Sequence, residues 1–428
     1  MKMLNSRWMK ALVITVVVIV CLIGGGYLYL QHLIGKVEST LTGCSLESSN
    51  FRNIVDFDYD SGWIVVKAKV NGSEREFDFI FDSGAQTVFS DSLFSELGID
   101  DYKRIGIKTD TAAHAFKNEI VSLESLELGG VKFGNIGAIV VESSEYDMLN
   151  CVSPYGIIGY NILQTCCFQI DYKKRQILIT DRVDSVANMS DIEWIGYTTS
   201  GQETPIFPAI IDDNINVDLF FDTGYRGTVS LSSETLYENI GNQYPDRIAK
   251  YTARPTIDLS GGKDIESYQK MLFKTSISVF GSDTIEDIVV SVADIPETDY
   301  TGLIGSKFLE NFIITLDYRN KRVGFLPNGI MTGDDRKTTF GLSYAPVNNR
   351  IIVSAVYKDS EAESRGILAG DEVISINGTS ISNLDSNVFC DFFRGEFSFV
   401  TEEDSVLALE TMRDGESIRY TLTRYEIF

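Results

Sequence analysis

The stretch F-D-F-I-F-D-S-G, residues 77–84, returns later in the chain as V-D-L-F-F-D-T-G, residues 217–224. In this alignment Asp82 matches Asp222, and the Ser-Gly after the first aspartate matches the Thr-Gly after the second. One such stretch predicts only a strand that runs into a turn, because Asp, Ser and Gly are common turn residues. The second copy favours a functional explanation for the two aspartates.

A second repeated block follows each of these stretches. G-I-I-G-Y-N-I-L-Q-T-C-C-F-Q-I-D-Y-K-K-R-Q-I-L-I, residues 156–179, aligns without a gap to G-L-I-G-S-K-F-L-E-N-F-I-I-T-L-D-Y-R-N-K-R-V-G-F, residues 302–325. Two blocks in the same order and at nearly the same offset indicate a duplicated unit. Their Gly- and Asn-punctuated β patterns predict two β lobes, residues 60–180 and 204–328, with the more polar segment 181–201 between them.

Short helices are also predicted in each unit, directly after the strand that follows the aspartate. The expected N-caps and C-terminal stops are Ser and Gly residues. They are Ser90 and Gly98 in the first unit, and Ser232 or Ser233 and Gly241 in the second.

Composition limits the partners. The chain has 428 residues, 44% of them hydrophobic, which is too long for one ordinary core and predicts several domains. Its formal net charge of -24 argues against nucleic acid or anionic lipid as a partner and favours a solvated surface.

An N-terminal membrane anchor is predicted. Residues 11–30 carry no charge and match the length of about 20 residues that a membrane-spanning helix needs. Lys2, Arg7 and Lys10 precede them, so the positive-inside bias puts residues after 35 on the extracytoplasmic side, periplasmic or cell-surface. A cleaved signal peptide is the alternative, although the apolar stretch exceeds the usual roughly 7 to 15 residues. Residues 36–59 are interpreted as a linker; the alternative is that residues 39–60 cover the cleft before activation.

The six cysteines and two histidines give no metal-binding pattern, so neither metal nor cofactor is expected. Cys166 and Cys167 align with Phe312 and Ile313 of the second repeat, which predicts core positions. Cys151 can pair with either of them in an oxidising compartment, but free buried thiols are the preferred interpretation.

Two carboxyls within reach of one water can hydrolyse a peptide bond without a covalent intermediate, one accepting a proton and the other donating one. Holding them together raises one pKa strongly, so the pair shares a proton. A duplicated lobe with one aspartate in each copy supplies this arrangement. The hydroxyls of Ser83 and Thr223 can brace the opposite loop, and Gly84 and Gly224 permit close backbone approach.

The two F-D-[S/T]-G loops, each followed by an apolar-apolar-Gly element (Ile157-Ile158-Gly159 and Leu303-Ile304-Gly305), resemble the retropepsin-like aspartic proteases. The resemblance covers nearly all of residues 60–328 and implies that Asp82 and Asp222 are the catalytic dyad. It also implies that the apolar-apolar-Gly elements pack beneath the loops and that flaps lie around 110–116 and 259–264.

The second loop departs from the first after its glycine. Tyr225 stands where the first loop has the small Ala85, so it either shapes a pocket or marks a lobe that has lost activity. Arg226 is interpreted as a solvated surface residue, with pairing to a substrate carboxylate as the alternative.

The last quarter of the chain, residues 338–428, contains S-R-G-I-L-A-G-D-E-V-I-S-I-N-G-T at positions 364–379. This resembles the PDZ-domain signature, in which Gly370-Asp371 opens a strand and Asn377-Gly378 turns a hairpin. The resemblance places a carboxylate-binding loop at Gly341, Leu342, Ser343 and Tyr344, where a peptide C-terminus would add a strand to the sheet edge.

The sequence therefore predicts a mostly β protein: two pseudo-symmetric retropepsin-like lobes and a small α+β PDZ domain, preceded by residues 1–35 as a cytosolic tip and one transmembrane helix. The predicted function is an aspartic endopeptidase that acts on proteins or peptides. The alternatives are a non-catalytic peptide-binding scaffold and an enzyme that is active only as a homodimer through Asp82.

Overall fold

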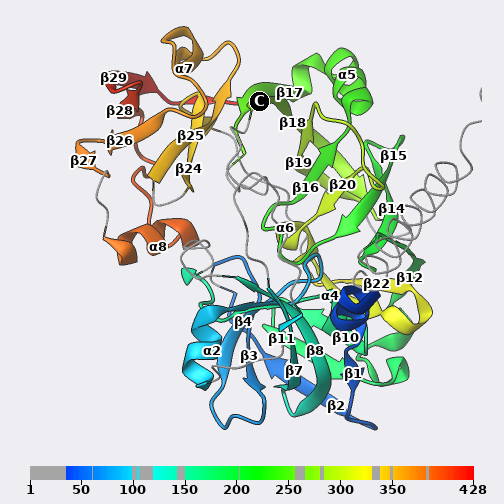
Figure 1. The fold of residues 1–428 in the computed structure, drawn as a ribbon. Coiled ribbons are helices and arrows are strands. Elements are labelled where there is room, and N and C mark those ends of the chain that lie inside the picture. Colours follow the sequence, from blue (N-terminus) through cyan, green and yellow to red (C-terminus); the bar gives the residue numbers. More distant parts are fainter. Residues whose placement is uncertain are drawn as a thin grey trace, which may run out of the picture.

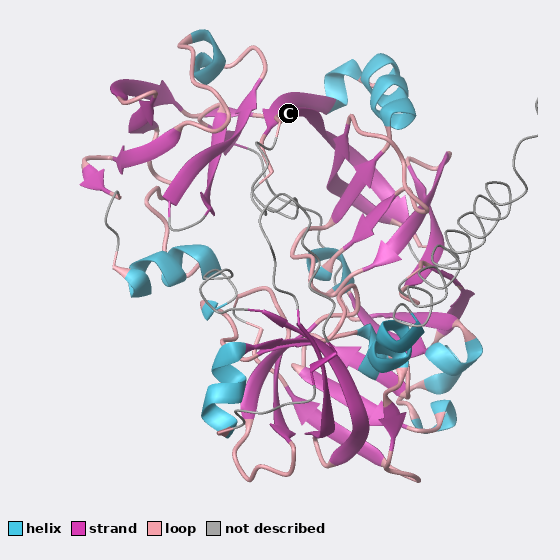
Figure 2. Ribbon diagram, viewed as in Figure 1, coloured by secondary structure: helices cyan, strands magenta, loops and turns pink. Residues whose placement is uncertain are grey.

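The computed structural model describes residues 35–59, 61–98, 104–105, 119–141, 150–201, 203–255, 266–279, 284–329, 338–347, 350–381 and 385–428. These residues form three large sheets, one two-stranded sheet and short helices (Figure 1). Strands dominate the described chain, as Figure 2 shows. None of the helices among these residues is long and apolar enough to span a bilayer, and the predicted anchor at residues 11–30 lies outside them.

The first lobe is an eight-stranded sheet that closes on itself, because β7 pairs with both β3 and β8. Alternation buries one face of its strands, as in β3, where Val66, Ala68 and Val70 are buried. The strands in spatial order are β1 (Ser45–Leu46), β8 (Val131–Val141), β5 (Val88–Ser90), β9 (Gly156–Ile158), β4 (Phe77–Phe81), β3 (Val65–Val70), β7 (Glu119–Leu128) and β6 (Arg104–Ile105).

The second lobe repeats this plan. β15 pairs in parallel with β20 as β4 does with β9, and β16 pairs in parallel with β19 as β5 does with β8. Its strands in spatial order are β13 (Thr198–Thr199), β14 (Pro205–Ile211), β15 (Ile215–Phe221), β20 (Gly302–Ile304), β16 (Val229–Ser232), β19 (Ile285–Ala293), β18 (Tyr268–Ser278) and β17 (Ile248–Ala253).

The helices after the loops begin where the sequence predicts. Ser90 caps α2 (Asp91–Leu97), which ends at Gly98 in the left-handed conformation. Ser233 caps α5 (Glu234–Gln243). The predicted stop at Gly241 is wrong, because the helical hydrogen bond from Tyr244 N to Ile240 O carries the helix past it. Two further short helices, α4 (Tyr160–Leu163) and α6 (Ser306–Leu309), follow Gly159 and Gly305.

A six-stranded sheet joins the two lobes. Its central pair, β10 and β21, comes from equivalent parts of the two repeats, and Gln169 lies opposite its own equivalent Thr315. The pseudo-twofold axis therefore passes between these two strands. The strands in spatial order are β12 (Glu193–Gly196), β22 (Arg322–Pro327), β21 (Phe312–Asp317), β10 (Cys167–Asp171), β11 (Gln176–Thr180) and β2 (Arg52–Asp56).

Two predicted connecting segments belong to these sheets. Residues 36–59 supply β1, which pairs with β8, and β2, which pairs with β11. The segment 181–201 supplies β12, which pairs with β22. The interpretation of residues 36–59 as a plain linker is wrong, because their backbone groups complete the edges of two sheets.

The C-terminal domain has a separate core built around Leu342, Val353, Ile376, Leu409 and Leu422. As predicted, Asn377 and Gly378 have positive φ at a hairpin, here between β26 and β27. Its elements are β23 (Thr338–Thr339), β24 (Leu342–Val347), β25 (Arg350–Tyr357), α7 (Glu361–Ser364), β26 (Glu372–Ile376), β27 (Thr379–Ser380), α8 (Ser386–Arg394), β28 (Val406–Arg413), β29 (Glu416–Thr423) and β30 (Tyr425–Glu426).

This domain is joined to both lobes. Its strand β25 pairs with β17 of the second lobe, with Tyr357 opposite Tyr251, so one sheet of 14 strands runs through both units. Its helix α8 lies next to the first lobe (Figure 1) and is attached there by a disulfide from Cys390 to Cys151.

The cysteine prediction is therefore half correct. Cys166 and Cys167 are free and buried, as their alignment with apolar residues predicts. The expectation that Cys151 is free, or pairs with one of them, is wrong, because its partner comes from the C-terminal domain, far along the chain.

Candidate active site

Each predicted catalytic aspartate follows the strand that leads to its loop. Asp82 comes after β4, and its N–H donates to the carbonyl of Ile158 in β9 at 3.0 Å. Asp222 comes after β15, and its N–H donates to Ile304 in β20 at 3.1 Å. The apolar-apolar-Gly elements thus lie directly against the loops, as the resemblance implies.

The glycines of these two elements have no room for a side chain. A Cβ on Gly159 would lie 2.3 Å from the carbonyl oxygen of Ala85, and a Cβ on Gly305 would lie 2.3 Å from that of Tyr225. The backbone of each loop therefore rests on a glycine of its own lobe.

Reciprocal hydrogen bonds tie the two loops together. The N–H of Ser83 donates to Thr223 Oγ1 at 3.0 Å, and the N–H of Thr223 donates to Ser83 Oγ at 3.1 Å. Ser83 Oγ in turn donates to the Phe221 carbonyl, and Thr223 Oγ1 donates to the Phe81 carbonyl. Both residues are fully buried, so these bonds are shielded from water and hold the loops in register.

Backbone N–H groups orient both carboxyls in the same way. Asp82 Oδ1 accepts from the N–H groups of Gly84 and Ala85 at 2.8 and 3.2 Å. Asp222 Oδ1 accepts from those of Gly224 and Tyr225 at 2.9 and 3.1 Å. Each carboxyl is therefore fixed by its own loop in a matching orientation.

The two carboxyls meet across the glycines. A Cβ on Gly84 would lie 2.7 Å from Asp222 Cγ, and a Cβ on Gly224 would lie 2.2 Å from Asp82 Oδ2. Only glycine at these two positions allows each carboxyl to reach the other loop. One chain thus brings both aspartates together without a second copy.

The surroundings of the pair favour protonation. Each aspartate keeps part of its surface accessible, yet atoms of both lobes enclose its carboxyl. Burial raises the pKa of Asp82, opposed by the hydrogen bond from the Gly84 N–H. Burial also raises the pKa of Asp222 well above its usual range, and the charge of Asp82 adds to this. Two such carboxyls share a proton and titrate as a pair.

Tyr225, the main departure between the loops, folds back on its own lobe. A Cβ on Gly227 would lie 2.2 Å from its hydroxyl oxygen, and a Cβ on Gly305 would lie 2.5 Å from its ring. The ring occupies the space that these two glycines leave open, which accounts for a bulky residue after the second Gly.

Two residues outside the repeated loops also donate to them, and the sequence predicts neither. Trp63 Nε1 in the first lobe donates to the Gly224 carbonyl at 2.8 Å. Thr204 Oγ1 in the second lobe donates to the Ser83 carbonyl at 3.1 Å. Each lobe thus donates a side-chain hydrogen bond to the aspartate loop of the other lobe, from a residue just before its own first long strand. A Trp and a Thr at these places share no pattern that would have revealed them.

Arg226 is exposed, but its interpretation as a simply solvated residue is wrong. Its guanidinium lies 4.0 Å from the centre of the Trp63 ring and donates to the carbonyls of Ser61 and Phe393. The predicted flaps around 110–116 and 259–264 lie outside the described residues. Within the described part of the chain, no group of three or more His, Cys, Asp or Glu side chains is placed to hold a metal ion.

The predicted peptide-binding residues of the C-terminal domain lie at one edge of its sheet. Gly341 has a φ of 85° and precedes β24, which contains Leu342, Ser343 and Tyr344. Among the described strands, β24 pairs with β25 alone, and the Tyr344 ring stacks on Phe392 of α8 with ring centres 5.9 Å apart. β24 and α8 therefore lie next to each other, on the side of the domain that carries the predicted peptide-binding residues.

Comparisons with known families agree with the two kinds of domain. A model described as an aspartyl protease matches residues 66–162, and a PDZ-domain model matches residues 315–389. The chain therefore contains an aspartyl protease domain and a C-terminal PDZ domain. The first match includes Asp82 but not Asp222. The second begins inside β21 and ends inside α8, whereas the separate core of the C-terminal domain runs from Phe340 to Leu422.

No curated protein matches the chain. Among solved structures, the crystal structure of basic 7S globulin from soybean is similar, with 11% sequence identity and a TM-score of 0.36. The similarity covers 64% of this chain and 94% of that chain.

Proposed function

We propose that the protein is an aspartic endopeptidase with Asp82 and Asp222 as its catalytic dyad. The observation that carries this proposal is the approach of each carboxyl to the glycine of the opposite loop, with the reciprocal Ser83–Thr223 bonds beneath. This symmetric arrangement offers two carboxyls to one water, which is the requirement for direct hydrolysis of a peptide bond.

In the proposed reaction, the ionised carboxyl takes a proton from water as the water oxygen attacks the scissile carbonyl carbon. The protonated carboxyl gives its proton to the carbonyl oxygen, and a tetrahedral diol forms. The carbon–nitrogen bond then breaks as a proton passes to the amine, which leaves a carboxylic acid and an amine. The raised pKa values of both carboxyls support the singly protonated pair that this sequence needs.

The PDZ domain is proposed to recognise a peptide or protein. A peptide C-terminus would bind at Gly341 to Tyr344, and its chain would continue along the edge of β24 that does not pair with β25. The peptide would then face α8. The positive φ of Gly341 and the single pairing of β24 support this binding mode.

The proposed location is extracytoplasmic, with residues 11–30 as a membrane anchor. The Cys151–Cys390 disulfide supports this location, because such bonds persist mainly in oxidising compartments.

The test is turnover of a diverse peptide library by the full-length chain in detergent, from acid to neutral pH. Asp82→Asn and Asp222→Asn are each expected to abolish cleavage while circular dichroism remains unchanged. Loss in only the Asp82 variant would point to a dimer, and a folded parent without activity under any condition would favour a non-catalytic scaffold.

A further inference from the structure

Three successive residues of the first lobe touch the second lobe beside the dyad. The Ser61 carbonyl accepts a hydrogen bond from Arg226 at 3.3 Å. The Gly62 carbonyl accepts one from Ser306 Oγ at 3.0 Å. Trp63 donates through its indole N–H to the carbonyl of Gly224 at 2.8 Å. Gly224 is the residue against which the Asp82 carboxyl packs, so the indole of Trp63 fixes a part of the loop that defines the dyad geometry.

The indole is held in turn by the PDZ domain. The ring of Phe393, near the end of α8, stacks on Trp63 with centres 5.3 Å apart and planes 27° apart. The Arg226 guanidinium lies 5.2 Å from the centre of the Phe393 ring and donates to the Phe393 carbonyl at 3.1 Å. Trp63, Arg226 and Phe393 therefore form one cluster from the first lobe, the second lobe and the PDZ domain.

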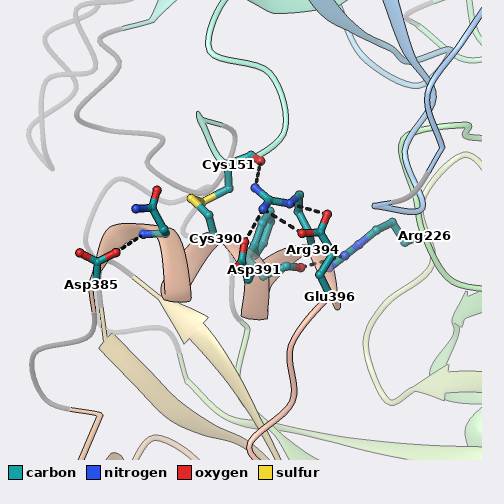
Figure 3. The surroundings of a disulfide bond; sticks show 9 residues. Cys151, Arg226, Asp385, Cys390, Asp391, Arg394 and Glu396 are labelled. Carbon is teal, nitrogen blue, oxygen red and sulfur yellow. Dashed lines mark hydrogen bonds and ion pairs between the residues drawn. A yellow bond between two sulfur atoms is a disulfide. The ribbon is translucent and has the colours of Figure 1, made fainter.

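Helix α8 is anchored next to this cluster. Its Cys390 forms the disulfide with Cys151, and Arg394 Nη1 donates to the Cys151 carbonyl at 2.9 Å (Figure 3). Arg394 is itself held by ion pairs with Asp391 and Glu396. The end of α8 is thus fixed to the first lobe independently of the aromatic contact.

The residue before Phe393 contacts the peptide-binding side of the PDZ domain. Phe392 stacks on Tyr344 of β24, with centres 5.9 Å apart and planes 20° apart. Two neighbouring residues of α8 therefore contact different sites. Phe392 contacts the predicted peptide-binding strand, and Phe393 contacts Trp63, which donates to the loop of Asp222.

We propose that Trp63 is a positioning residue for the second catalytic loop, and that α8 of the PDZ domain holds it in place. The active site is then complete only when the PDZ domain is docked, and displacement of α8 reaches the dyad through Phe393, Trp63 and Gly224. The part of this inference that concerns activity rests on the proposed function, but the loop itself can be measured without turnover.

The test compares Trp63→Phe, which keeps an aromatic ring and removes the N–H donor, with Phe393→Ala, which removes the stacked ring. Phe397→Ala is the matched control, since Phe397 is an exposed aromatic of the same domain that contacts Phe399. Amide hydrogen exchange of peptides covering residues 222–227 is followed in the full-length chain, together with kcat and KM.

Both test variants are expected to exchange faster in residues 222–227 and to lose about tenfold in kcat, equivalent to about 1.4 kcal/mol, with a smaller change in KM. The control should match the parent. Unchanged exchange in Phe393→Ala would overturn the role of the PDZ domain, and unchanged exchange in Trp63→Phe would overturn that of Trp63. Faster exchange in both variants of an inactive parent would support the inference and refute the proposed function.

Discussion

Gln169 lies directly opposite Thr315 in the sheet between the lobes, and its Nε2 donates to Thr315 Oγ1 at 3.0 Å. The two residues occupy the same position in the two repeats, so one side chain in each repeat meets its own counterpart on the pseudo-twofold axis. Gln169 also donates to the Ala187 carbonyl and accepts from the Ala187 N–H, both at 3.0 Å. It therefore fixes the centre of the joint between the lobes.

Gln169→Leu should lower the free energy of unfolding by about 1–3 kcal/mol, because the buried hydroxyl of Thr315 and the backbone N–H and carbonyl of Ala187 lose their partner. Denaturant titration followed by circular dichroism measures this loss. Gln176→Leu in the neighbouring strand is the control, since the side chain of Gln176 makes an exposed hydrogen bond with Asp56 and its loss should change stability by about 0.5 kcal/mol or less. Equal losses in both variants would contradict the role assigned to Gln169.

The repeat explains why so much of the protease part could be predicted. Asp82 and Asp222, the glycines beside them and the apolar-apolar-Gly elements each occur twice, so one copy tests the interpretation of the other. The structure brings these residues together around one pseudo-twofold axis.

Residues that occur once had no such support in the sequence. Trp63 contacts the loop of Asp222 by donating to the backbone carbonyl of Gly224. Every residue has such a carbonyl, so this partner leaves no pattern in the sequence. Cys151 and Cys390 are separated by 239 residues, so only the docked PDZ domain shows that they are neighbours. The edge strands β1 and β2 are short, and the sequence does not predict them because their pairing partners lie far along the chain.

Ser83→Ala and Thr223→Val should each weaken the joint between the catalytic loops. Each change removes a hydroxyl that both accepts from the opposite backbone N–H and donates to a carbonyl, at an expected cost of about 1–3 kcal/mol. Thermal unfolding measures the cost, and turnover should fall with it. Thr223→Ser keeps the hydroxyl and is the control; a Thr223→Val variant that is as stable as the parent would contradict the role assigned to these hydrogen bonds.

The dyad should make the protein less stable as the pH rises. Burial raises the pKa of Asp222 in the folded protein, with the charge of Asp82 as a further cause, whereas an unfolded aspartate titrates near about 3.9. Between those two values the folded state binds more protons than the unfolded state, so the free energy of unfolding falls with increasing pH.

Asp222→Asn removes this titration. Its Tm relative to the parent should therefore increase from about pH 4 to about pH 7. Differential scanning calorimetry at fixed ionic strength tests this, and Asp82→Asn should show a change of the same sign because burial raises that pKa as well. A difference in Tm that stays constant across this range would mean that the pair carries no shared proton in the folded state.

The disulfide should contribute to the stability of the docked PDZ domain. It closes a loop between residues 239 positions apart, and loss of a native disulfide typically costs about 2–5 kcal/mol. Cys390→Ser should lower the unfolding temperature and expose the α8 segment to proteolysis, because α8 loses its covalent attachment to the first lobe and keeps noncovalent contacts there, such as the Phe393 stack and the Arg394 hydrogen bond. Reductant should shift the parent in the same direction. The double variant Cys151→Ser/Cys390→Ser is the control and should not respond to reductant; a reductant effect that persists there would assign the sensitivity to another thiol.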